Sequence, residues 1–209
     1  MYNKYLKRIF DLILSLIMII CLSWLFIVIS IFIKLSSKGK IFYKQKRIGK
    51  NKKEFYILKF RTMKSTAPGD VPTHLLQNPE QYITSIGKIL RKTSMDELPQ
   101  LFNILKGDMS LVGPRPALWN QYDLIAERDK YDANDVRPGL TGWAQINGRD
   151  EIAIPLKASY DGVYINRMSF FFDVVCILKT VLCVLKHDGV KEGAMEGSKN
   201  NEKSVNNWG

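Results

Sequence analysis

An uninterrupted apolar segment near the N-terminus limits the fold of this chain more than any other feature. Residues 9–33 read IFDLILSLIMIICLSWLFIVISIFI, and after Asp11 no charged residue occurs for 22 positions. A helix of about 20 residues is long enough to cross the roughly 30 Å of hydrocarbon in a bilayer. A cleaved signal peptide has a shorter apolar region, whereas this segment ends in Lys34 and a run of lysines. We therefore expect the segment to be retained as a membrane anchor.

Basic residues on both sides of this segment bear on how it enters the membrane. Lys4, Lys7 and Arg8 precede it, and nine lysines and arginines lie within residues 34–53. Short basic flanks tend to stay on the cytoplasmic side, so a straight span would place one cluster outside. A re-entrant hairpin bent near Ser23 keeps both clusters inside, because two legs of about 11 residues reach about half of the hydrocarbon core. The re-entrant form is favoured, and a span remains the alternative.

The positive charge is concentrated at the same end. The chain of 209 residues has a net charge of +11, but residues 1–64 hold 15 lysines and arginines against two acids, a balance of +13. An acidic membrane surface suits this end better than nucleic acid does, and the chain lacks zinc-finger spacing and RNA-binding motifs. Cys21, Cys176 and Cys183 lie in apolar surroundings and are interpreted as small buried hydrophobes in a reducing compartment.

The remaining sequence predicts an α+β fold that is mainly helical. Two alternating apolar runs around a Gly49-Lys50-Asn51 turn predict a short β-hairpin, and a run near the C-terminus predicts an amphipathic core or interfacial helix. The expected hairpin strands are 41–43 and 55–60; the expected helices are 81–92, 97–105, 117–131 and 169–185; the expected loops are 65–80 and the glycine-rich stretch 137–149.

Three regions follow from this pattern. Residues 1–36 are expected to form the membrane-embedded helix, residues 37–188 a small globular domain, and residues 189–209 a disordered tail that lacks apolar residues able to build a core.

The adjacent carboxylates Asp96 and Glu97 permit two interpretations. Ser94 followed by Glu97 fits a capping box, but Pro99 favours a helix that begins at Asp96, because the missing amide of proline then costs no hydrogen bond. Acids at a helix start are most often structural. In the other interpretation, the pair performs chemistry at the positive end of a helix, where phosphate groups also bind.

Arginines near this pair strengthen the chemical interpretation. Arg115 lies between two prolines in GPRP, which restricts its backbone, and Arg137 and Arg149 bracket the glycine-rich stretch. Arginine is suited to bidentate phosphate contact. A carboxylate pair, fixed arginines and a membrane anchor, without a nucleotide-binding glycine fingerprint, together indicate phosphate chemistry at a membrane.

Four stretches of sequence resemble the bacterial sugar transferase family, the small monotopic phosphoglycosyl transferases. They are KRIFD at 7–11, KFRTM at 59–63, RKTSMDELPQLFNILKGDMSLVGPRP at 91–116 and RPGLTGWAQINGR at 137–149. The resemblance covers roughly residues 1–190 in the family's order. It implies transfer of a sugar 1-phosphate from a UDP-sugar, with an N-acetylated amino sugar expected, to polyprenyl phosphate. UMP release, a Mg²⁺ cofactor and a place at the cytoplasmic face of the bacterial inner membrane, on lipid headgroups, are implied as well.

The resemblance also implies roles for individual residues. Asp96 is expected to be the nucleophile and a Mg²⁺ ligand, with Glu97 as its dyad partner, in a ping-pong reaction through a phosphosugar-aspartyl intermediate. The expected substrate-binding residues are Lys59, Arg91, Arg115, Arg149 and Asp161.

One departure from the family and two other functions remain open. The family typically has Ser-Pro in the middle of its membrane helix, whereas this chain has Ser23-Trp24, so the re-entrant and spanning forms are not separated by sequence. The alternative functions are a non-enzymatic basic adaptor at the membrane surface, for which Asp96 would be dispensable, and a nucleic-acid binder with steep salt dependence.

Overall fold

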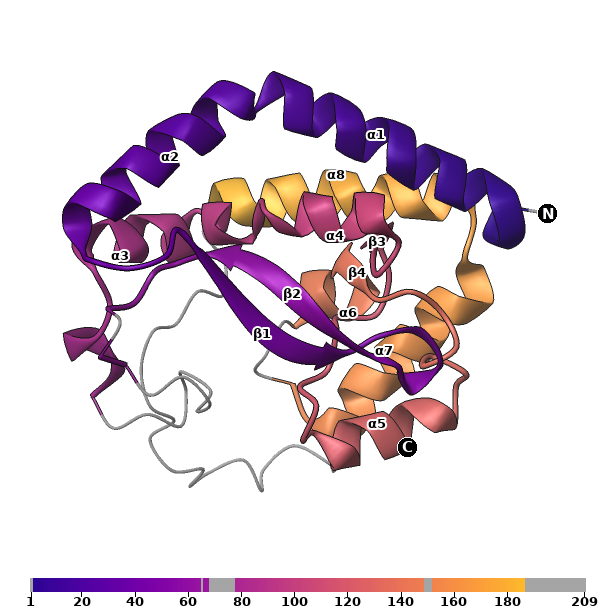
Figure 1. The fold of residues 1–209 in the computed structure, drawn as a ribbon. Coiled ribbons are helices and arrows are strands. Elements are labelled where there is room, and N and C mark those ends of the chain that lie inside the picture. Colours follow the sequence, from indigo (N-terminus) through magenta and orange to yellow (C-terminus); the bar gives the residue numbers. More distant parts are fainter. Residues whose placement is uncertain (1, 65, 68–77, 149–151, 187–209) are drawn as a thin grey trace.

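The computed structural model describes residues 2–64, 66–67, 78–148 and 152–186, and it has the expected α+β fold (Figure 1). The helices are α1 (Lys7–Cys21), α2 (Ser23–Ser36), α3 (Ser85–Lys92), α4 (Gln100–Lys106), α5 (Tyr122–Asp129), α6 (Trp143–Asn147), α7 (Ile154–Arg167) and α8 (Phe170–Lys186). The strands are β1 (Phe42–Ile48), β2 (Glu54–Phe60), β3 (Ser110–Val112) and β4 (Gly139–Thr141). Short π or 3-10 turns occur at Tyr2–Leu6, Lys50–Lys52, Pro79–Gln81 and Met95–Glu97.

The long apolar segment forms two helices that meet at a bend. The axes of α1 and α2 are bent by 61° at Leu22, next to the predicted bend residue Ser23. Within the described ranges no one helix has the length and apolar character to cross a bilayer, and only the bent pair taken together does. The amide of Leu22 bonds to Met18 O at 2.9 Å, and its carbonyl accepts from the amide of Phe26 at 3.0 Å. Both backbone groups of Leu22 are therefore hydrogen-bonded, which lowers the cost that a break in lipid would carry.

Charged residues in the first turns of α1 fasten this helix to the domain. Lys7 Nζ lies 2.6 Å from Oδ2 of Asp173, a fully buried residue of α8. Arg8 donates to the last carbonyls of α4 at 2.7 and 3.2 Å, where a cation also suits the helix dipole. Asp11, 2% exposed, accepts from the amide of Leu111 in β3 at 3.1 Å. The KRIFD stretch thus joins the apolar segment to three elements of the domain.

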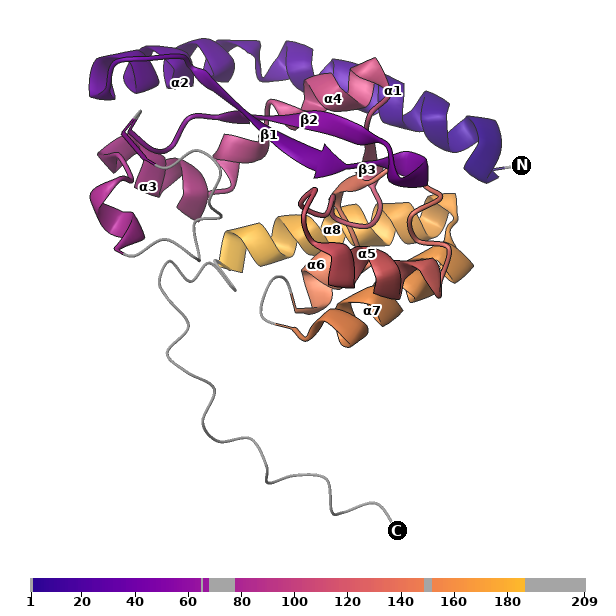
Figure 2. The ribbon, with the colours of Figure 1, turned by 60° about the horizontal axis from the view of Figure 1, so that its bottom comes forward.

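The predicted β-hairpin is confirmed and extends further than the apolar runs indicated. β1 and β2 pair antiparallel from Phe42↔Phe60 to Ile48↔Glu54. Inward-facing Phe55 and Ile57 pack with α4 and β3 in the main core, while Phe60 packs on Phe26 of α2, with ring centroids 5.4 Å apart. The hairpin therefore lies between the N-terminal helices and the helices α5 to α7, as Figure 2 shows.

Several predicted boundaries differ from those observed. Helix α3 begins only at Ser85, because Thr84 Oγ1 accepts from the amide of Gly87 and caps it. Helix α5 is shorter at both ends than the helix expected at 117–131, and it starts later because Ala117 and Leu118 pair with β1. The glycine-rich stretch is not a loop, because it supplies β4, paired parallel to β3, and α6. The expected tail and most of the loop at 65–80 lie outside the described residues.

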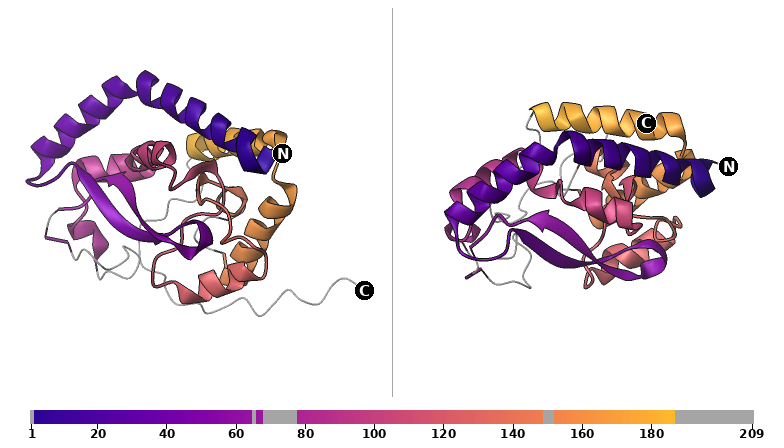
Figure 3. Two further views of the ribbon diagram at one scale, coloured as in Figure 1. Left: turned by 45° about the vertical axis from the view of Figure 1, so that its right-hand side comes forward. Right: turned by 45° about the horizontal axis from the view of Figure 1, so that its top comes forward.

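Large apolar side chains cover one outer surface of the molecule. On α1 and α2 the exposed residues include Ile13, Ile17, Ile20, Trp24 and Phe32, and on α8 they include Phe171, Leu178, Val181 and Leu182. Helix α8 lies beside α1 in both views of Figure 3, and the rings of Phe10 and Phe170 are 5.3 Å apart. Exposed apolar surface on this scale is typical of a protein or membrane interface.

The expectation for the cysteines is correct only in part. Cys176 is buried and Cys183 is partly buried, but Cys21 is exposed. Cys21 is the last residue of α1, next to the bend, and it belongs to neither core cluster.

Candidate active site

Asp96 and Glu97 lie in a 3-10 turn, Met95–Glu97, that leads from α3 into α4. The prediction that Asp96 caps a helix with Pro99 in its first turn is wrong, because α4 begins at Gln100 and neither Ser94 nor Pro99 makes a side-chain cap bond. Ser94 has a positive φ of 56°, which turns the chain sharply between α3 and the 3-10 turn. The two carboxylates are therefore presented on a tight turn.

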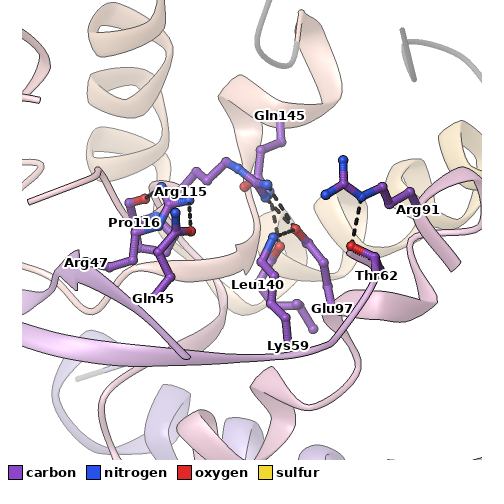
Figure 4. Close-up of polar contacts among 10 residues, drawn as sticks. All are labelled: Gln45, Arg47, Lys59, Thr62, Arg91, Glu97, Arg115, Pro116, Leu140 and Gln145. Atoms are coloured by element: carbon purple, nitrogen blue, oxygen red, sulfur yellow. Dashed lines mark hydrogen bonds and ion pairs between the residues drawn. The ribbon is translucent and has the colours of Figure 1, made fainter. Parts of the chain in front are cut away.

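Two cations from distant parts of the chain bind the Glu97 carboxylate (Figure 4). Lys59 Nζ on β2 lies 2.7 Å from Oε1. Arg115 approaches with both terminal nitrogens, Nη2 at 2.9 Å from Oε1 and Nη1 at 3.4 Å from Oε2. Glu97 and Lys59 have side chains only 16% and 17% exposed, so this pairing is shielded from solvent.

A buried asparagine fixes Lys59 relative to the carboxylate pair. Asn103 of α4, 2% exposed, donates from Nδ2 to Tyr56 O at 2.8 Å and accepts from the amide of Leu58 at 2.9 Å. These two bonds hold β2 against α4, the helix that follows the turn of Asp96 and Glu97. The position of Lys59, the next residue on β2, is thereby set with respect to Glu97.

Two glycines and a second arginine fix Arg115. A side chain at Gly113 would place its Cβ 2.7 Å from Arg137 O, so β3 and β4 can approach only with glycine there. The amide of Gly139 donates to Pro114 O at 2.9 Å, and Arg47 on β1 donates to Pro116 O at 3.0 Å. The Pro-Arg-Pro turn is thus held on both sides, and its guanidinium is directed at Glu97 (Figure 4).

Arg91 and Gln145 complete the surroundings of the pair. Arg91, in the last turn of α3, donates from Nε to Thr62 Oγ1 at 2.9 Å, and its charge acts on Asp96. Gln145 of α6 donates to Leu140 O at 3.1 Å, while its Oε1 is buried and has no hydrogen-bond partner in the described part of the chain. Figure 4 draws both side chains near Glu97.

The two carboxyls have opposite electrostatic environments. Burial, together with the negative charge of Glu97, raises the pKa of Asp96 to about 6 despite the nearby cations of Lys59, Arg91 and Arg115. Burial alone would raise the pKa of Glu97 too, but the charges and hydrogen bonds of Arg115 and Lys59 hold it far below its usual value. Glu97 is consequently a fixed anion, and Asp96 is the carboxyl whose protonation changes near neutral pH.

Of the expected substrate-binding residues, Asp161 is not brought to this site. Asp161 of α7 is 1% exposed, and Arg128 of α5 binds its Oδ2 with Nε and Nη2, each at 2.7 Å. This buried pair joins α5 to α7, so a substrate contact by Asp161 stays a prediction that the geometry does not support. Arg149 lies outside the described residues.

Sequence reasoning did not identify Asn103 or Gln145. Both lie inside stretches that carry the family resemblance, but an amide side chain in a helix gives no local signal of the strand or cation that it will meet. A polar residue among the apolar positions of α4, Asn103 between Phe102 and Ile104, was the one available indication.

Comparison with known proteins identifies the class of protein with this arrangement. A family model described as bacterial sugar transferase matches residues 2–187. An uncharacterized sugar transferase, EpsL of Bacillus subtilis (strain 168), is 41% identical over 90% of this chain and 91% of its own length. In two other relatives, the chain matches less than half of the relative's own length. One is an Aeromonas hydrophila protein named UDP-N-acetylgalactosamine-undecaprenyl-phosphate N-acetylgalactosaminephosphotransferase, 36% identical over 90% of this chain and 45% of its own length. The other is an Escherichia coli (strain K12) protein named UDP-glucose:undecaprenyl-phosphate glucose-1-phosphate transferase, 38% identical over 86% of this chain and 40% of its own length.

These matches confirm the predicted resemblance and the prediction that the protein is a transferase. The lysine, arginines and carboxylates described above all lie within the matched residues. The chain belongs to the bacterial sugar transferase family.

Proposed function

We propose that this protein transfers a sugar 1-phosphate from a UDP-sugar to a polyprenyl phosphate and releases UMP. The observation that carries the proposal is the environment of Asp96. Its carboxyl lies beside a fixed anion and three cations, its pKa is raised to about 6, and no hydrogen bond to it is found among the described residues. A half-buried carboxylate with this freedom is suited to act as a nucleophile.

In the first displacement, an Asp96 carboxylate oxygen forms a bond to the β-phosphorus of the UDP-sugar. The bond from that phosphorus to the oxygen bridging the two phosphates breaks, and UMP leaves with the electron pair. Lys59, Arg91 and Arg115 reduce the repulsion between the carboxylate and the diphosphate. Glu97 orients Lys59 and Arg115, which it binds at 2.7 and 2.9 Å.

In the second displacement, a phosphate oxygen of the lipid acceptor attacks the same phosphorus and the Asp96 carboxylate leaves. Two successive displacements at one site allow a soluble donor and a lipid acceptor to react without being bound together. Ping-pong kinetics are therefore expected. The raised pKa of Asp96 also makes its carboxylate a better nucleophile than an ordinary aspartate at neutral pH.

The residues present are compatible with a Mg²⁺ ion shared with the substrate. In the described ranges no three His, Cys, Asp or Glu side chains cluster to hold a metal, but Mg²⁺ is commonly held by one or two carboxylates together with substrate phosphates. Asp96 is the site carboxylate that no cation binds directly, so we propose it as the protein ligand. Bound Mg²⁺ would supply charge neutralisation at the diphosphate.

A place at the cytoplasmic face of the bacterial inner membrane is part of the proposal. The exposed apolar side chains of α1, α2 and α8, listed above, offer a surface for lipid, and the basic residues after α2 suit anionic headgroups. The bent α1–α2 pair is proposed to be re-entrant. Donors with an N-acetylated amino sugar are expected, although the names of relatives include both an N-acetylgalactosamine and a glucose transferase.

The test is UMP release by the full chain in lipid nanodiscs. Wild-type protein given undecaprenyl phosphate and a panel of UDP-sugars should release UMP with at least one donor, and Asp96→Asn should abolish the release. The matched control, Asp123→Asn, changes an exposed acid of α5 and should keep full activity. Peptide mapping after reaction without acceptor should find the phosphosugar on Asp96. A modification elsewhere, or an active Asp96→Asn variant, contradicts the assignment of Asp96 as the nucleophile. No UMP release by the wild type with any donor contradicts the proposed activity and favours the non-enzymatic adaptor.

A further inference from the structure

An apolar groove runs along α2 on the inner side of the bend. Its volume is about 610 Å³, within the range of about 300–1,000 Å³ typical of ligand sites. Its lining residues come from α1, α2, the start of β1 and α4; the principal ones are Ile19, Phe26, Ser30, Ile31, Phe42 and Phe102.

The groove occupies one defined stripe of α2. The lining positions 23, 26, 27, 30, 31, 34 and 35 recur at helical spacing, as residues on one face do. Ile29 and Ile33, on the adjacent face, are buried in the core, and Val28 and Phe32 are exposed and do not line the groove. The groove therefore lies beside the face of α2 that packs on the core. It is not a packing defect within that face, so a ligand can occupy it.

Its walls are apolar although two serines line it. Ser30 Oγ donates to Phe26 O at 2.6 Å, so its hydroxyl is satisfied within the helix and presents little polarity to the groove. Ser23 and Ser30 are small and stand between the larger Phe26, Ile27 and Ile31, which leaves the hollow. Only one charged residue lines it, Lys34 in the last turn of α2. An apolar trough with an ammonium group at one end is complementary to a lipid with an anionic head.

The Lys34 end of the groove is the end nearer the active site. Arg61, two residues after Lys59 on the chain, donates to Ile33 O at 3.3 Å and to Ser37 O at 2.7 Å, and these carbonyls flank Lys34. Two residues of extended chain span about 7 Å. The cation of the catalytic site and the charged end of the groove are thus held together by one short segment.

The carboxylate turn also rests on α2. Met95 and Leu98, the neighbours of Asp96 and Glu97, pack on the cluster that contains Ile29, Ile33 and Phe60. The face of α2 next to the groove therefore supports the turn that carries Asp96 and Glu97.

We infer that this groove seats the isoprenoid chain of the polyprenyl phosphate acceptor, with the acceptor phosphate at its Lys34 end. The inference rests on the proposed function and adds a binding site for the acceptor's tail. The branched isoprenoid chain lies in the apolar groove. The anionic phosphate pairs with Lys34 and from there reaches the phosphorus bound to Asp96.

Ser30→Trp, which fills the groove, tests the inference in nanodiscs with undecaprenyl phosphate and the short analogue geranyl phosphate as acceptors. Its KM for undecaprenyl phosphate should rise about tenfold, equivalent to the loss of about 1.4 kcal/mol of binding, while the KM values for geranyl phosphate and UDP-sugar stay unchanged. Val28→Trp, the same change on a face of α2 that does not line the groove, should alter none of the three. Lys34→Gln should raise the KM for both acceptors, because both carry the phosphate.

Equal effects of Ser30→Trp and Val28→Trp, or a KM change confined to UDP-sugar, would overturn the inference. A diazirine phospholipid that crosslinks to the groove equally with and without undecaprenyl phosphate would also overturn the inference, because the groove would then hold bulk lipid. The proposed function is judged separately, by UMP release from wild-type protein. If the wild type releases UMP and every groove variant has the same kinetics, the acceptor site is refuted and the proposed function stands.

Discussion

At the scale of single residues, the site gives two neighbouring carboxyls different pKa values, because only one of them has cations in direct contact. Glu97 binds Lys59 and Arg115, and Asp96, one residue earlier, feels the same charges at longer range while burial opposes its ionisation. A fixed anion beside a titrating one is a common way to assign different roles to two acids.

The raised pKa of Asp96 predicts the acid limb of the pH profile. Because the proposed attack on phosphorus requires an ionised carboxylate, kcat/KM should increase as pH rises through about 6 and level off above it. Glu97→Gln removes a negative neighbour but leaves both cations, so it should lower the pKa of Asp96 and move this limb to lower pH by about one unit, with reduced activity. Rates of UMP release from pH 4.5 to 8.5 measure the acid limb of the wild type and of Glu97→Gln. The same limb in both proteins would contradict its assignment to the ionisation of Asp96.

The same pKa shift has a consequence for stability. A folded-state pKa above the unfolded value means that protonated Asp96 is favoured in the folded protein, so this contribution is present at low pH and is lost as pH rises through about 6. Asp96→Asn should therefore raise the melting temperature at pH 7.5 while abolishing activity, and the gain should shrink at pH 5. A lower melting temperature at pH 7.5 would show that ionised Asp96 stabilises the fold.

At the scale of elements, charged groups rather than apolar contacts decide where α1 attaches. Fully buried Asp173 of α8 accepts from Lys7 at 2.6 Å, Tyr2 at 2.5 Å and Tyr164 at 2.8 Å. Apolar packing alone would allow α1 to slide or rotate, because lipid tails are as apolar as its neighbours. The buried network specifies one register for the helix.

A double-mutant cycle tests this attachment. Asp173→Asn leaves the ammonium of Lys7 buried without its counter-charge and should cost about 3–5 kcal/mol of unfolding free energy. Adding Lys7→Met removes the uncompensated charge, so the double variant should recover most of that loss. Thermal unfolding of the four proteins in one detergent provides the cycle, and additive losses would show that the two residues are not coupled.

At the scale of the whole molecule, the bent α1–α2 pair and α8 present apolar side chains on the outside, while the carboxylate turn lies beneath them (Figure 1). If this surface lies in the membrane as proposed, the site is at the depth of lipid headgroups, where an acceptor phosphate resides. In the proposed function, membrane attachment and chemistry then depend on the same helix, α2, which packs one face against the carboxylate turn and exposes others.

Topology is testable on the full chain. If the bent pair is re-entrant, single cysteines at positions 3 and 38, in a background with Cys21, Cys176 and Cys183 replaced, should be labelled from the same side of sealed vesicles. A cysteine in place of Thr66, in the globular part, reports the side of that part. Labelling of positions 3 and 38 from opposite sides would establish a span.

Local patterns were sufficient to predict most of the helices and the β-hairpin, and they singled out the residues proposed to react. The apolar run, the alternating hairpin strands and the amphipathic C-terminal helix depend on spacing within one segment, and the carboxylate pair and the Pro-Arg-Pro turn stand in contiguous motifs. Packing decided the rest. The sequence placed a bend near Ser23, but only the structure gives its angle of 61°. The approach of Gly113 to Gly139 and the clamp by Asn103 join segments far apart in sequence, and Asp161 pairs with Arg128 rather than lying at the site. Such contacts follow from how whole elements fill a core, and no short stretch of sequence contains that information.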